Sequence, residues 1–535
     1  MRKLIFIIGF LFAILPLQAK DLYIAQAATS AANGSSCSNA YAYTFFNMSG
    51  NWGAGAGQIG PGTTVYLCGT VTSELIFQGS GAPGKNVVLK FENGTIMTSP
   101  AWNPDAININ GQSYITIDGG TRCGSGTTCS ANLTGTGRIQ NTANGSSLAN
   151  QVPSNLISGG SSCGHDIEVG NLLLLNAYTR TVRTDESSGA GNSAGVALVN
   201  CGSNLYVHDL TSTWAHTNIL VSANSSVSNW DISNNATAHS TWGIATSMGG
   251  NSQIGSDIKI YGNDVNNGPD WDDPTDLFHR DGIFVYGHSS TGYFNGLYVY
   301  NNYLHGDWGN AATLTAFVYI NQNLQNVYFF NNVLQSSANS PSNGLFASGW
   351  GDSSQFFYNN TFISYGKGGG MGMYGGGTDP ANSTIIENNI TYDVPSPINL
   401  YQNGANSIVA VDYNDYYGWD NTGKGPWNIG LEYDNFAGWQ ASACGSGRCD
   451  PHGSIGNPKL NPNATLQSGS AAIGLGKNLY SVCNGQPNPG LGALCYDKAG
   501  IARPSIGAWD AGAYSYNGTK SAAVQAPTGL TVIVK

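Results

Sequence analysis

Charged residues are scarce in this sequence of 535 residues, because Asp, Glu, Lys and Arg together make up only 10% of it. Long helices and coiled coils are rich in charged residues, Ala and Leu, so the composition excludes them as the main architecture. Lys and Arg number 20 against 31 Asp and Glu, which gives a formal net charge of −11. A nucleic-acid-binding surface is normally basic, so nucleic acid is a poor candidate for a partner.

Long apolar runs are missing as well, except at the N-terminus. Arg2 and Lys3 precede the apolar segment 4–17, and Gln18-Ala19 supplies a small residue at which cleavage can occur. This pattern predicts a secretory signal peptide over residues 1–19. No later run reaches the 18 apolar residues of a membrane span. We therefore expect a secreted or cell-surface-associated protein without a membrane span.

The ten cysteines fit an oxidising destination. Metal binding is the alternative, but the sequence has no CxxC motif and no His/Cys cluster with zinc spacing. Three pairs are close enough in sequence to close small disulfide loops: Cys123–Cys129, Cys444–Cys449 and Cys483–Cys495.

The middle of the chain repeats one pattern, in which an apolar strand is followed by Asn and a second apolar pair. The copies centre on Asn235, Asn263, Asn302, Asn332, Asn360, Asn389 and Asn414, with weaker copies at Asn171 and at Asp209, which stands in the Asn place. Most intervals lie in the high twenties, with room for about three short strands. This period predicts one turn of a coiled parallel sheet, whose stacked turns bury their apolar faces together.

Asn suits the tight corner of such a turn, because it tolerates left-handed backbone conformations and bonds neighbouring backbone. Stacked Asn side chains can also form a ladder inside the coil. Cys163 lies eight residues before Asn171, and Cys201 lies eight before Asp209. Equal phase in adjacent turns predicts a Cys163–Cys201 disulfide.

The sequence resembles the right-handed parallel β-helix proteins of the pectate-lyase-like superfamily. Besides the repeat, the segment from Gly60 to Gly94 is similar to their first turns, and LQSGSAAIGLG…RPSIGAWDAGAY (residues 466–514) is similar to the last turn of exported β-helix proteins. The resemblance implies an all-β solenoid. The expected division is a cap at 20–59, the coil at 60–419, irregular C-terminal turns at 420–516 and a tail at 517–535. The superfamily contains lyases, hydrolases, tail-spikes and adhesins, so the fold leaves the activity open.

In family members the Asn corner follows the second strand of each turn. The resemblance then makes GVALVN, NILVSA, GIATSM, GIFVYG, AFVYIN, GLFASG and INLYQN first strands. Alternation places Ile283 and Val285 inside the coil. The side chains expected to face outward are those of Phe284, Tyr286, Phe317, Tyr319, Phe346, Ser222 and Ser247. Exposed aromatic rings can stack on sugar rings, so this face is a candidate polysaccharide-binding surface.

Two insertions fall just before a first strand, at residues 180–193 and 269–281. Loops in that position border the polysaccharide groove of catalytic family members. The second insertion is unusually polar for this chain: it contains Asp270, Asp272, Asp273, Asp276, His279, Arg280 and Asp281.

Three interpretations of this insertion remain open. In a lyase, Asp270, Asp272, Asp273 and Asp276 would hold Ca²⁺ against a uronate, while Arg280 or His279 abstracts the α-proton. In a hydrolase, one Asp would act as acid and another as base or nucleophile. Across these interpretations the candidate catalytic residues are Asp281, Arg280 and His279. The HRDG segment at 279–282 is similar to the NTDG motif of polygalacturonase-like hydrolases, although their DD and GHG motifs are missing. The third interpretation is a solvated acidic loop or a structural Ca²⁺ site.

His216, His239 and His279 precede first strands at similar phase, so we expect them to line the groove edge with Trp242 beside them. The Gly-rich segment 366–377 has no following helix and is predicted to be a turn rather than a phosphate site. The sequence thus favours a secreted polysaccharide lyase. A hydrolase and a non-catalytic glycan-binding or adhesive protein are the alternatives.

Overall fold

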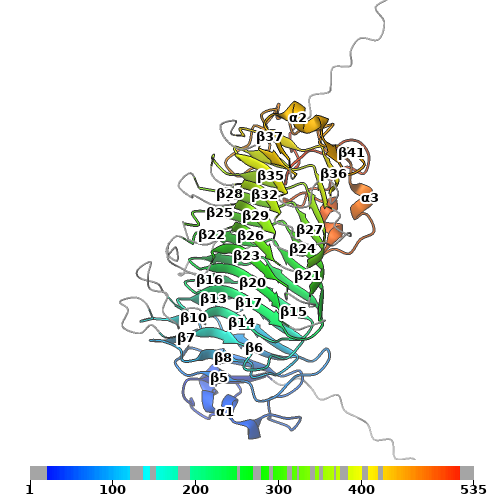
Figure 1. Ribbon diagram of the computed structural model, residues 1–535. Coiled ribbons are helices and arrows are strands. Elements are labelled where there is room, and N and C mark those ends of the chain that lie inside the picture. Colours follow the sequence, from blue (N-terminus) through cyan, green and yellow to red (C-terminus); the bar gives the residue numbers. More distant parts are fainter. Residues whose placement is uncertain are drawn as a thin grey trace, which may run out of the picture.

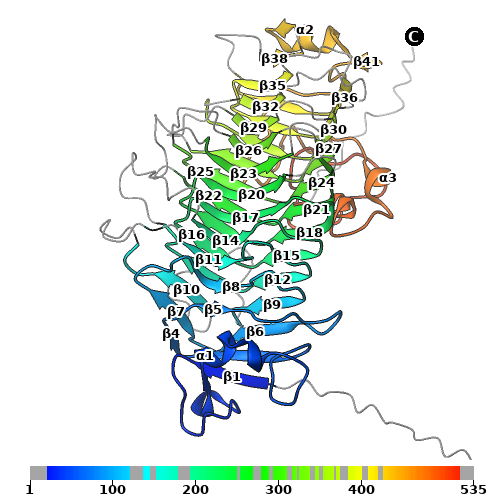
Figure 2. The same ribbon diagram turned by 60° about the horizontal axis from the view of Figure 1, so that its bottom comes forward.

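The computed structural model describes residues 21–120, 137–144, 152, 154–178, 193–249, 253–268, 279–287, 293–309, 316–321, 324–337, 344–348, 353–366, 369–373, 384–400, 408–419, 426–429 and 431–518. Figures 1 and 2 show short strands stacked turn upon turn along one axis, from the blue N-terminal end to the yellow C-terminal end. Each turn contributes one strand to each of three parallel sheets.

The first sheet contains the strands that open each turn and, at its C-terminal edge, one last strand that pairs antiparallel to its neighbour. Its described strands are β5 (Leu75–Ile76), β8 (Asp105–Asn108), β11 (Asn155–Ser158), β14 (Ala194–Leu198), β17 (Thr217–Ala223), β20 (Trp242–Met248), β23 (Asp281–Tyr286), β26 (Ala316–Asn321), β29 (Gly344–Ser348), β32 (Gly369–Met373), β35 (Ser396–Leu400), β38 (Trp427–Asn428) and β39 (Glu432–Tyr433). The first strands expected from the sequence are therefore confirmed. The prediction of a turn over 366–377 is wrong, because β32 pairs with β29 and β35.

The second sheet precedes the asparagine corner. Its described strands are β1 (Asp21–Ala25), β2 (Tyr41–Ala42), β3 (Thr64–Cys68), β6 (Val87–Phe91), β9 (Ile115–Asp118), β12 (Ile167–Gly170), β15 (Leu205–His208), β18 (Val227–Ser233), β21 (Ile254–Tyr261), β24 (Tyr293–Tyr300), β27 (Leu324–Phe330), β30 (Ser353–Tyr358), β33 (Thr384–Glu387) and β36 (Ile408–Asp412).

The third sheet follows the corner and leads into the next turn. Its described strands are β4 (Thr70–Val71), β7 (Ile96–Ser99), β10 (Gly137–Asn141), β13 (Leu172–Leu175), β16 (Thr211–Thr213), β19 (Ala236–Ala238), β22 (Asp264–Asn266), β25 (Tyr303–Gly306), β28 (Val333–Ser336), β31 (Thr361–Ile363), β34 (Ile390–Tyr392) and β37 (Asp415–Tyr417).

Stacking in register lines the inside of the coil with columns of apolar side chains. Ile244, Ile283, Val318 and Phe346 pair in succession across the first sheet, and all four are buried. Each turn alone would expose this face, so the turns are stable only as a stack. The protein is a right-handed parallel β-helix, as the resemblance implied.

A ladder of asparagine side chains runs inside the coil at the corner between the second and third sheets. The Nδ2 of Asn332 donates to the Oδ1 of Asn360 in the next turn at 3.1 Å and to the carbonyl of Val299 at 2.9 Å. The backbone N–H of Asn332 donates to the same Oδ1 at 3.0 Å. The same pattern links the members of the ladder in order: Asn235, Asn263, Asn302, Asn332, Asn360, Asn389 and Asn414. The predicted ladder is thus confirmed.

The left-handed residue of each corner is the one before the ladder asparagine, which the sequence did not reveal. Asn331 has φ 54° and Asn359 has φ 54°, whereas the ladder positions that follow them are not left-handed. This division of roles explains the Asn-Asn pairs in the sequence. Asp209, with φ 53°, also occupies the left-handed position of its corner and not the ladder position. The placement of Asp209 in the ladder is therefore off by one residue, and Leu210 donates to Asn235 there instead.

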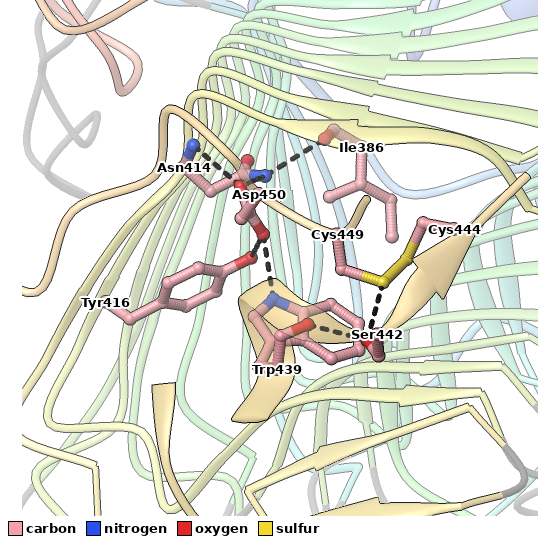
Figure 3. The surroundings of a disulfide bond; sticks show 8 residues. All are labelled: Ile386, Asn414, Tyr416, Trp439, Ser442, Cys444, Cys449 and Asp450. Carbon is pink, nitrogen blue, oxygen red and sulfur yellow. Dashed lines mark hydrogen bonds between the residues drawn. A yellow bond between two sulfur atoms is a disulfide. The ribbon is translucent and has the colours of Figure 1, made fainter. Parts of the chain in front are cut away.

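The ladder ends on a buried carboxylate, which Figure 3 shows beside the Cys444–Cys449 disulfide. Asp450 accepts from Asn414 Nδ2 at 2.9 Å, from Tyr416 Oη at 2.5 Å and from Trp439 Nε1 at 3.1 Å. Burial raises the pKa of Asp450 to about 6, and these hydrogen bonds oppose the rise. At neutral pH Asp450 is therefore a carboxylate, which only accepts hydrogen bonds, and it accepts those from the last donors of the ladder.

The segment predicted to be an N-terminal cap already contains part of the coil, because β1 pairs in register with β3. The helix α1 (Tyr43–Asn47) brings Phe46 against Trp52 and Phe77 at that end. A disulfide between Cys37 and Cys68, which the sequence analysis did not anticipate, ties this segment to β3.

The C-terminal segment closes the coil and then folds back along its side. The helix α2 (Phe436–Ala441) and the hairpin of β40 (Ala443–Cys444) and β41 (Gly447–Arg448) lie at the end of the stack, whereas α3 (Tyr480–Cys483) lies beside β24 and β27 (Figures 1 and 2). The left-handed asparagines hold this returning segment: Asn331 donates to Tyr496 O and Asn359 to Asp510 O. In these two Asn-Asn pairs, one residue thus bonds inward and the other outward.

The predicted disulfides Cys163–Cys201, Cys444–Cys449 and Cys483–Cys495 are confirmed. Cys123 and Cys129 lie outside the described residues. In the part of the chain that the structure describes, no helix is long and apolar enough to cross a membrane.

Replacing Asn360 by Asp should break the ladder with almost no change in side-chain shape. The new oxygen would face two acceptors, Phe329 O and Asn389 Oδ1, in place of the donor that now bonds both. We expect a loss of about 3 kcal/mol or more of unfolding free energy at pH 7, because buried unmatched polar groups and charges are costly. Urea unfolding followed by circular dichroism measures this. Asn463→Asp is the control, because exposed Asn463 uses only its Oδ1; equal stability of the two variants would contradict the role of the ladder.

The complementary variant Asp450→Asn tests the end of the ladder. Tyr416 can rotate its hydroxyl to accept from the new amide, but the indole N–H of Trp439 is only a donor and would lose its acceptor. We expect a loss of about 1–3 kcal/mol at pH 7. A thermal midpoint equal to that of the wild type would show that the charge is dispensable.

Candidate functional site

The candidate site lies on the outer face of the first sheet, where β20, β23 and β26 are neighbours. Phe284 pairs with Tyr319 on the following strand and Tyr286 follows Phe284 on the same face. Together with Trp242 and His279 these residues form a group that we call the aromatic cluster. All five side chains are partly exposed, so the predicted outward orientation of Phe284, Tyr286 and Tyr319 is confirmed.

The rings of the aromatic cluster pack on one another along the coil axis. Trp242 stacks on Phe284 with centroids 5.1 Å apart, and Phe284 stacks on Tyr319 at 5.6 Å. His279 meets Phe284 edge-on at 4.9 Å and Tyr319 edge-on at 5.0 Å. The indole N–H of Trp242 donates to the carbonyl of His279 at 2.9 Å. These contacts fix the imidazole ring between aromatic neighbours.

Asp281, at the start of β23, is hydrogen-bonded to the His279 ring and holds it in place. Its Oδ2 forms a hydrogen bond with Nδ1 of His279, and its Oδ1 accepts from the backbone N–H of Ala316 at 3.3 Å. The Asp281 side chain is 0% exposed and that of His279 is 25% exposed. Burial raises the pKa of Asp281, while His279, Ala316 and Arg280 oppose the rise. A neutral ring that carries its proton on Nδ1 has its lone pair on Nε2, which is the arrangement of a general base.

Arg280 points away from this surface. Its guanidinium is completely buried, and Nη1 donates to the carbonyl of Gly268 at 2.6 Å in the corner after β22. Arg280 therefore has no access to a glycan on the outer face. Of the three candidate catalytic residues, the structure brings His279 and Asp281 together and leaves only His279 accessible.

Two of the expected outward aromatic residues are instead in the core. Phe317 and Phe346 are both buried. Phe346 pairs with Val318, so it lies one register position away from the outward column and alternation turns it inward. Phe317 lies beside Gly282, at the start of a strand where the chain rounds a corner and consecutive side chains are buried. The proposed sugar contact of Phe317 is therefore wrong, whereas Ser222 and Ser247 are partly exposed as expected.

The three histidines do not form one column. His216 is buried and comes from the turn before Trp242. Its ring meets the Trp242 ring edge-on, with centroids 5.2 Å apart. His239 belongs to the preceding corner, where it has φ 53° and stacks flat on Trp214 at 4.5 Å. The expectation of a shared phase fails for His239, because the register aligns it with Trp214 and Asn267 rather than with His216.

The acidic part of the insertion, with Asp270, Asp272, Asp273 and Asp276, lies outside the described residues, as does segment 180–192 of the first insertion. Within the described ranges, no cluster of three or more His, Cys, Asp or Glu side chains could hold a metal ion. Calcium binding by these four aspartates stays a prediction.

A second ionisable group, for which the sequence gave no argument, lies on the outer face of the second sheet. His208 bonds Glu168 through Nε2 at 3.1 Å and Asp209 through Nδ1 at 2.9 Å. Gly170 makes room for the ring, because a Cβ there would lie 2.6 Å from His208. Only the register, which pairs β12 with β15, shows that Glu168 and His208 are neighbours.

The hydrogen bond that His208 donates to Glu168, together with Asp209, raises the pKa of His208. The folded pKa is higher than that of an unfolded His, near 6.5. The pair should therefore stabilise the fold fully below about pH 6.5 and lose this effect as the pH rises through the folded pKa. Glu168→Gln should lower the thermal midpoint at pH 5.5 and change it little at pH 8. A deficit that is equal at both pH values, or shared by the exposed-site control Glu432→Gln, would contradict this.

Comparison with solved structures gives distant similarities. They include the GH136 lacto-N-biosidase from Eubacterium ramulus (9% identity over 74% of this chain and 63% of that chain, TM-score 0.40). The tailspike protein of E. coli bacteriophage HK620, solved with a pentasaccharide, matches at 12% identity over 75% and 68% with TM-score 0.40. Pectate lyase Pel9A matches at 12% identity over 94% and 98% with TM-score 0.35. The chain thus spans less than two thirds of the first of these proteins.

No family model matches the chain, and no curated protein matches it. The sheet topology itself shows the parallel β-helix fold of this chain. At these identities the comparisons say nothing about activity, which has to be argued from the site.

Proposed function

We propose that this protein is an exported polysaccharide lyase that cleaves a uronate-containing glycan by β-elimination, with His279 as the base. The observation that supports the proposal is the pair of His279 and buried Asp281 within the aromatic cluster. The four disulfides in the described part of the chain fit an oxidising, extracellular location.

In the proposed reaction, His279 takes the proton from the carbon next to the uronate carboxyl group. The electron pair of that C–H bond forms a carbon–carbon double bond, and the glycosidic C–O bond on the neighbouring carbon breaks. The leaving oxygen takes up a proton, so that no oxidant or reductant is needed. Asp281 positions the ring and stabilises the imidazolium that forms. The aromatic cluster would hold the apolar parts of the neighbouring sugars.

A uronate also needs positive charge, which this face does not supply. No described strand of the first sheet contains Lys or Arg, and Arg280 is buried. We therefore propose that Asp270, Asp272, Asp273 and Asp276 hold Ca²⁺, since oxygen ligands suit this ion. When bound, the ion would neutralise the uronate carboxylate and so acidify the neighbouring C–H bond.

Paired-carboxylate hydrolysis has less support among the described residues. Asp281 is the carboxylate at this position, and it is buried and bonded to His279 and Ala316. A hydrolase needs two carboxyl groups that face the scissile bond. Binding without cleavage is the second candidate, because the stacked rings of Trp242, Phe284 and Tyr319 form a rigid surface suited to glycans.

The decisive assay incubates the mature protein with a panel of acidic and neutral polysaccharides and records both unsaturated products and reducing ends. We expect unsaturated uronate products from wild type, and a fall of about 10²–10⁴-fold in kcat for His279→Ala, the usual contribution of a general base. His239→Ala, which alters the stack on Trp214, is the control and should keep activity. Circular dichroism checks folding of each variant.

The outcomes separate the candidates. Reducing ends without unsaturated products would establish hydrolysis, and binding without any product would establish a non-catalytic protein. Full activity in His279→Ala would overturn the assigned base.

The calcium proposal has its own test. Chelation should abolish cleavage and added Ca²⁺ should restore it, and the double variant Asp272→Ala/Asp273→Ala should need more Ca²⁺. Calorimetric titration with Ca²⁺ alone gives a readout that is independent of turnover. Unchanged cleavage in chelator would remove the ion from the mechanism.

A further inference from the structure

A second recessed surface lies on a different wall of the coil, the outer face of the third sheet. It has a volume of about 450 Å³ and spans three consecutive turns, with residues from β25, from β28 and from the segment just after β31. Tyr303, His305, Gln335, Ser337 and Tyr365 supply its side chains. None of these residues belongs to the aromatic cluster, so this pocket is separate from the candidate active site.

The register explains why these side chains gather here. His305 pairs with Gln335 on the outer face, and the alternate positions Leu304 and Leu334 are buried in the core. The strand ends at Gly306, which has φ 92° and whose Cβ would lie 2.1 Å from the side chain of Asn267. No larger residue fits there, so the pocket stays open beside His305.

Hydrogen bonds between turns fix the polar groups of the pocket. The hydroxyl of Tyr303 donates to Gln335 Oε1 at 3.0 Å, and Gln335 Nε2 donates to the Tyr365 hydroxyl at 2.9 Å. His305 Nε2 bonds Asp264 Oδ1 at 2.8 Å. The hydroxyl oxygen of Ser337 is shielded from solvent and has no hydrogen-bond partner within the described part of the chain. The pocket therefore contains prearranged amide, hydroxyl and imidazole groups and one hydroxyl without a bond.

Flat aromatic surfaces accompany these polar groups. Tyr303 and His305 lie on the same face of one strand and stack with centroids 4.0 Å apart. Tyr365 is 42% exposed at the edge of the pocket. Aromatic rings next to amide, hydroxyl and carboxylate groups match a pyranose, which has apolar C–H faces and a rim of hydroxyl groups.

The charges favour a neutral sugar over an acidic one. Burial alone would raise the pKa of Asp264, but the hydrogen bond and charge of His305, together with Lys498, outweigh this effect and lower it. Asp264 is therefore a carboxylate at neutral pH. Lys498 is half-buried and donates to the carbonyl of Asn301. No Lys or Arg lines the pocket. A uronate carboxylate here would find no Lys or Arg among the lining residues, and His305 is already bonded to Asp264.

We propose that this pocket is a second glycan-binding site, which takes a neutral pyranose residue. It would anchor a neutral part of a glycan on the third sheet while the first sheet acts on another part. The proposal does not depend on catalysis at His279.

The test uses the mature full-length protein and isothermal titration calorimetry. The probes are neutral gluco-, manno-, xylo- and galacto-oligosaccharides, with oligogalacturonate as the acidic comparison. We expect at least one neutral oligosaccharide to bind, and Tyr365→Ala and Gln335→Ala each to weaken that binding at least tenfold. Saturation-transfer difference NMR should show contact with the sugar ring protons that is lost in both variants.

The matched control is Tyr417→Ala. Tyr417 lies in the same register column of the third sheet as Gln335 and Ile363, two turns beyond Ile363. It does not line the pocket. It should bind the neutral sugar as the wild type does. His279→Ala should also keep this binding, so failure of the lyase proposal and failure of this one are distinguishable. Absence of neutral-sugar binding in the wild type, binding that survives in both pocket variants, or equal loss in Tyr417→Ala would overturn the proposal.

Discussion

The interaction on which the structure depends is the line of buried asparagine amides at the corner between the second and third sheets. Each amide after Asn235 accepts two hydrogen bonds from the turn before it and donates to the turn or chain end after it, so all amides point the same way. A shift of one residue in any turn would leave these donors and acceptors buried without partners, at about 1–3 kcal/mol each. The ladder therefore holds the register of the turns from Asn235 to Asn414, and the carboxylate of Asp450 completes it (Figure 3).

Register in turn decides which side chains meet on the outer walls. The aromatic cluster forms because Phe284 and Tyr319 share an outward column, and Asp281 and His279 flank the same corner. The pocket on the third sheet forms in the same way from three turns that are about thirty residues apart in sequence. Both surfaces combine residues from different turns, which lie far apart in the sequence. A rigid solenoid can thus present different chemistry on different walls without additional domains.

The outward asparagines of the corners have a second consequence. They bond the returning C-terminal segment, whose Leu494 and Trp509 pack with Tyr300 and Phe330 on the outer face of the second sheet. This covers a row of stacked aromatic rings that would otherwise be exposed. The second sheet is therefore covered in its C-terminal half, and the same segment also packs on Val333 and Ile363 of the third sheet through Ala464 and Ala513. The two proposed glycan surfaces lie on the described outer faces of the first and third sheets.

The sequence by itself determined the solenoid, the ladder asparagines, the first strands and the Cys163–Cys201 disulfide, because a periodic pattern reports directly which residues occupy equivalent positions. Phe284, Tyr286 and Tyr319 could be placed outward by alternation alone. Only the tertiary structure decided the inward turn of Phe317 at its corner, the burial of Arg280 and the separation of His239 from His216. These depend on where each strand begins and on how a corner directs consecutive side chains, which repeats of unequal length do not specify. The partnership of His279 with buried Asp281 likewise depends on how the corner before β23 directs two nearby side chains, which the repeat pattern does not reveal.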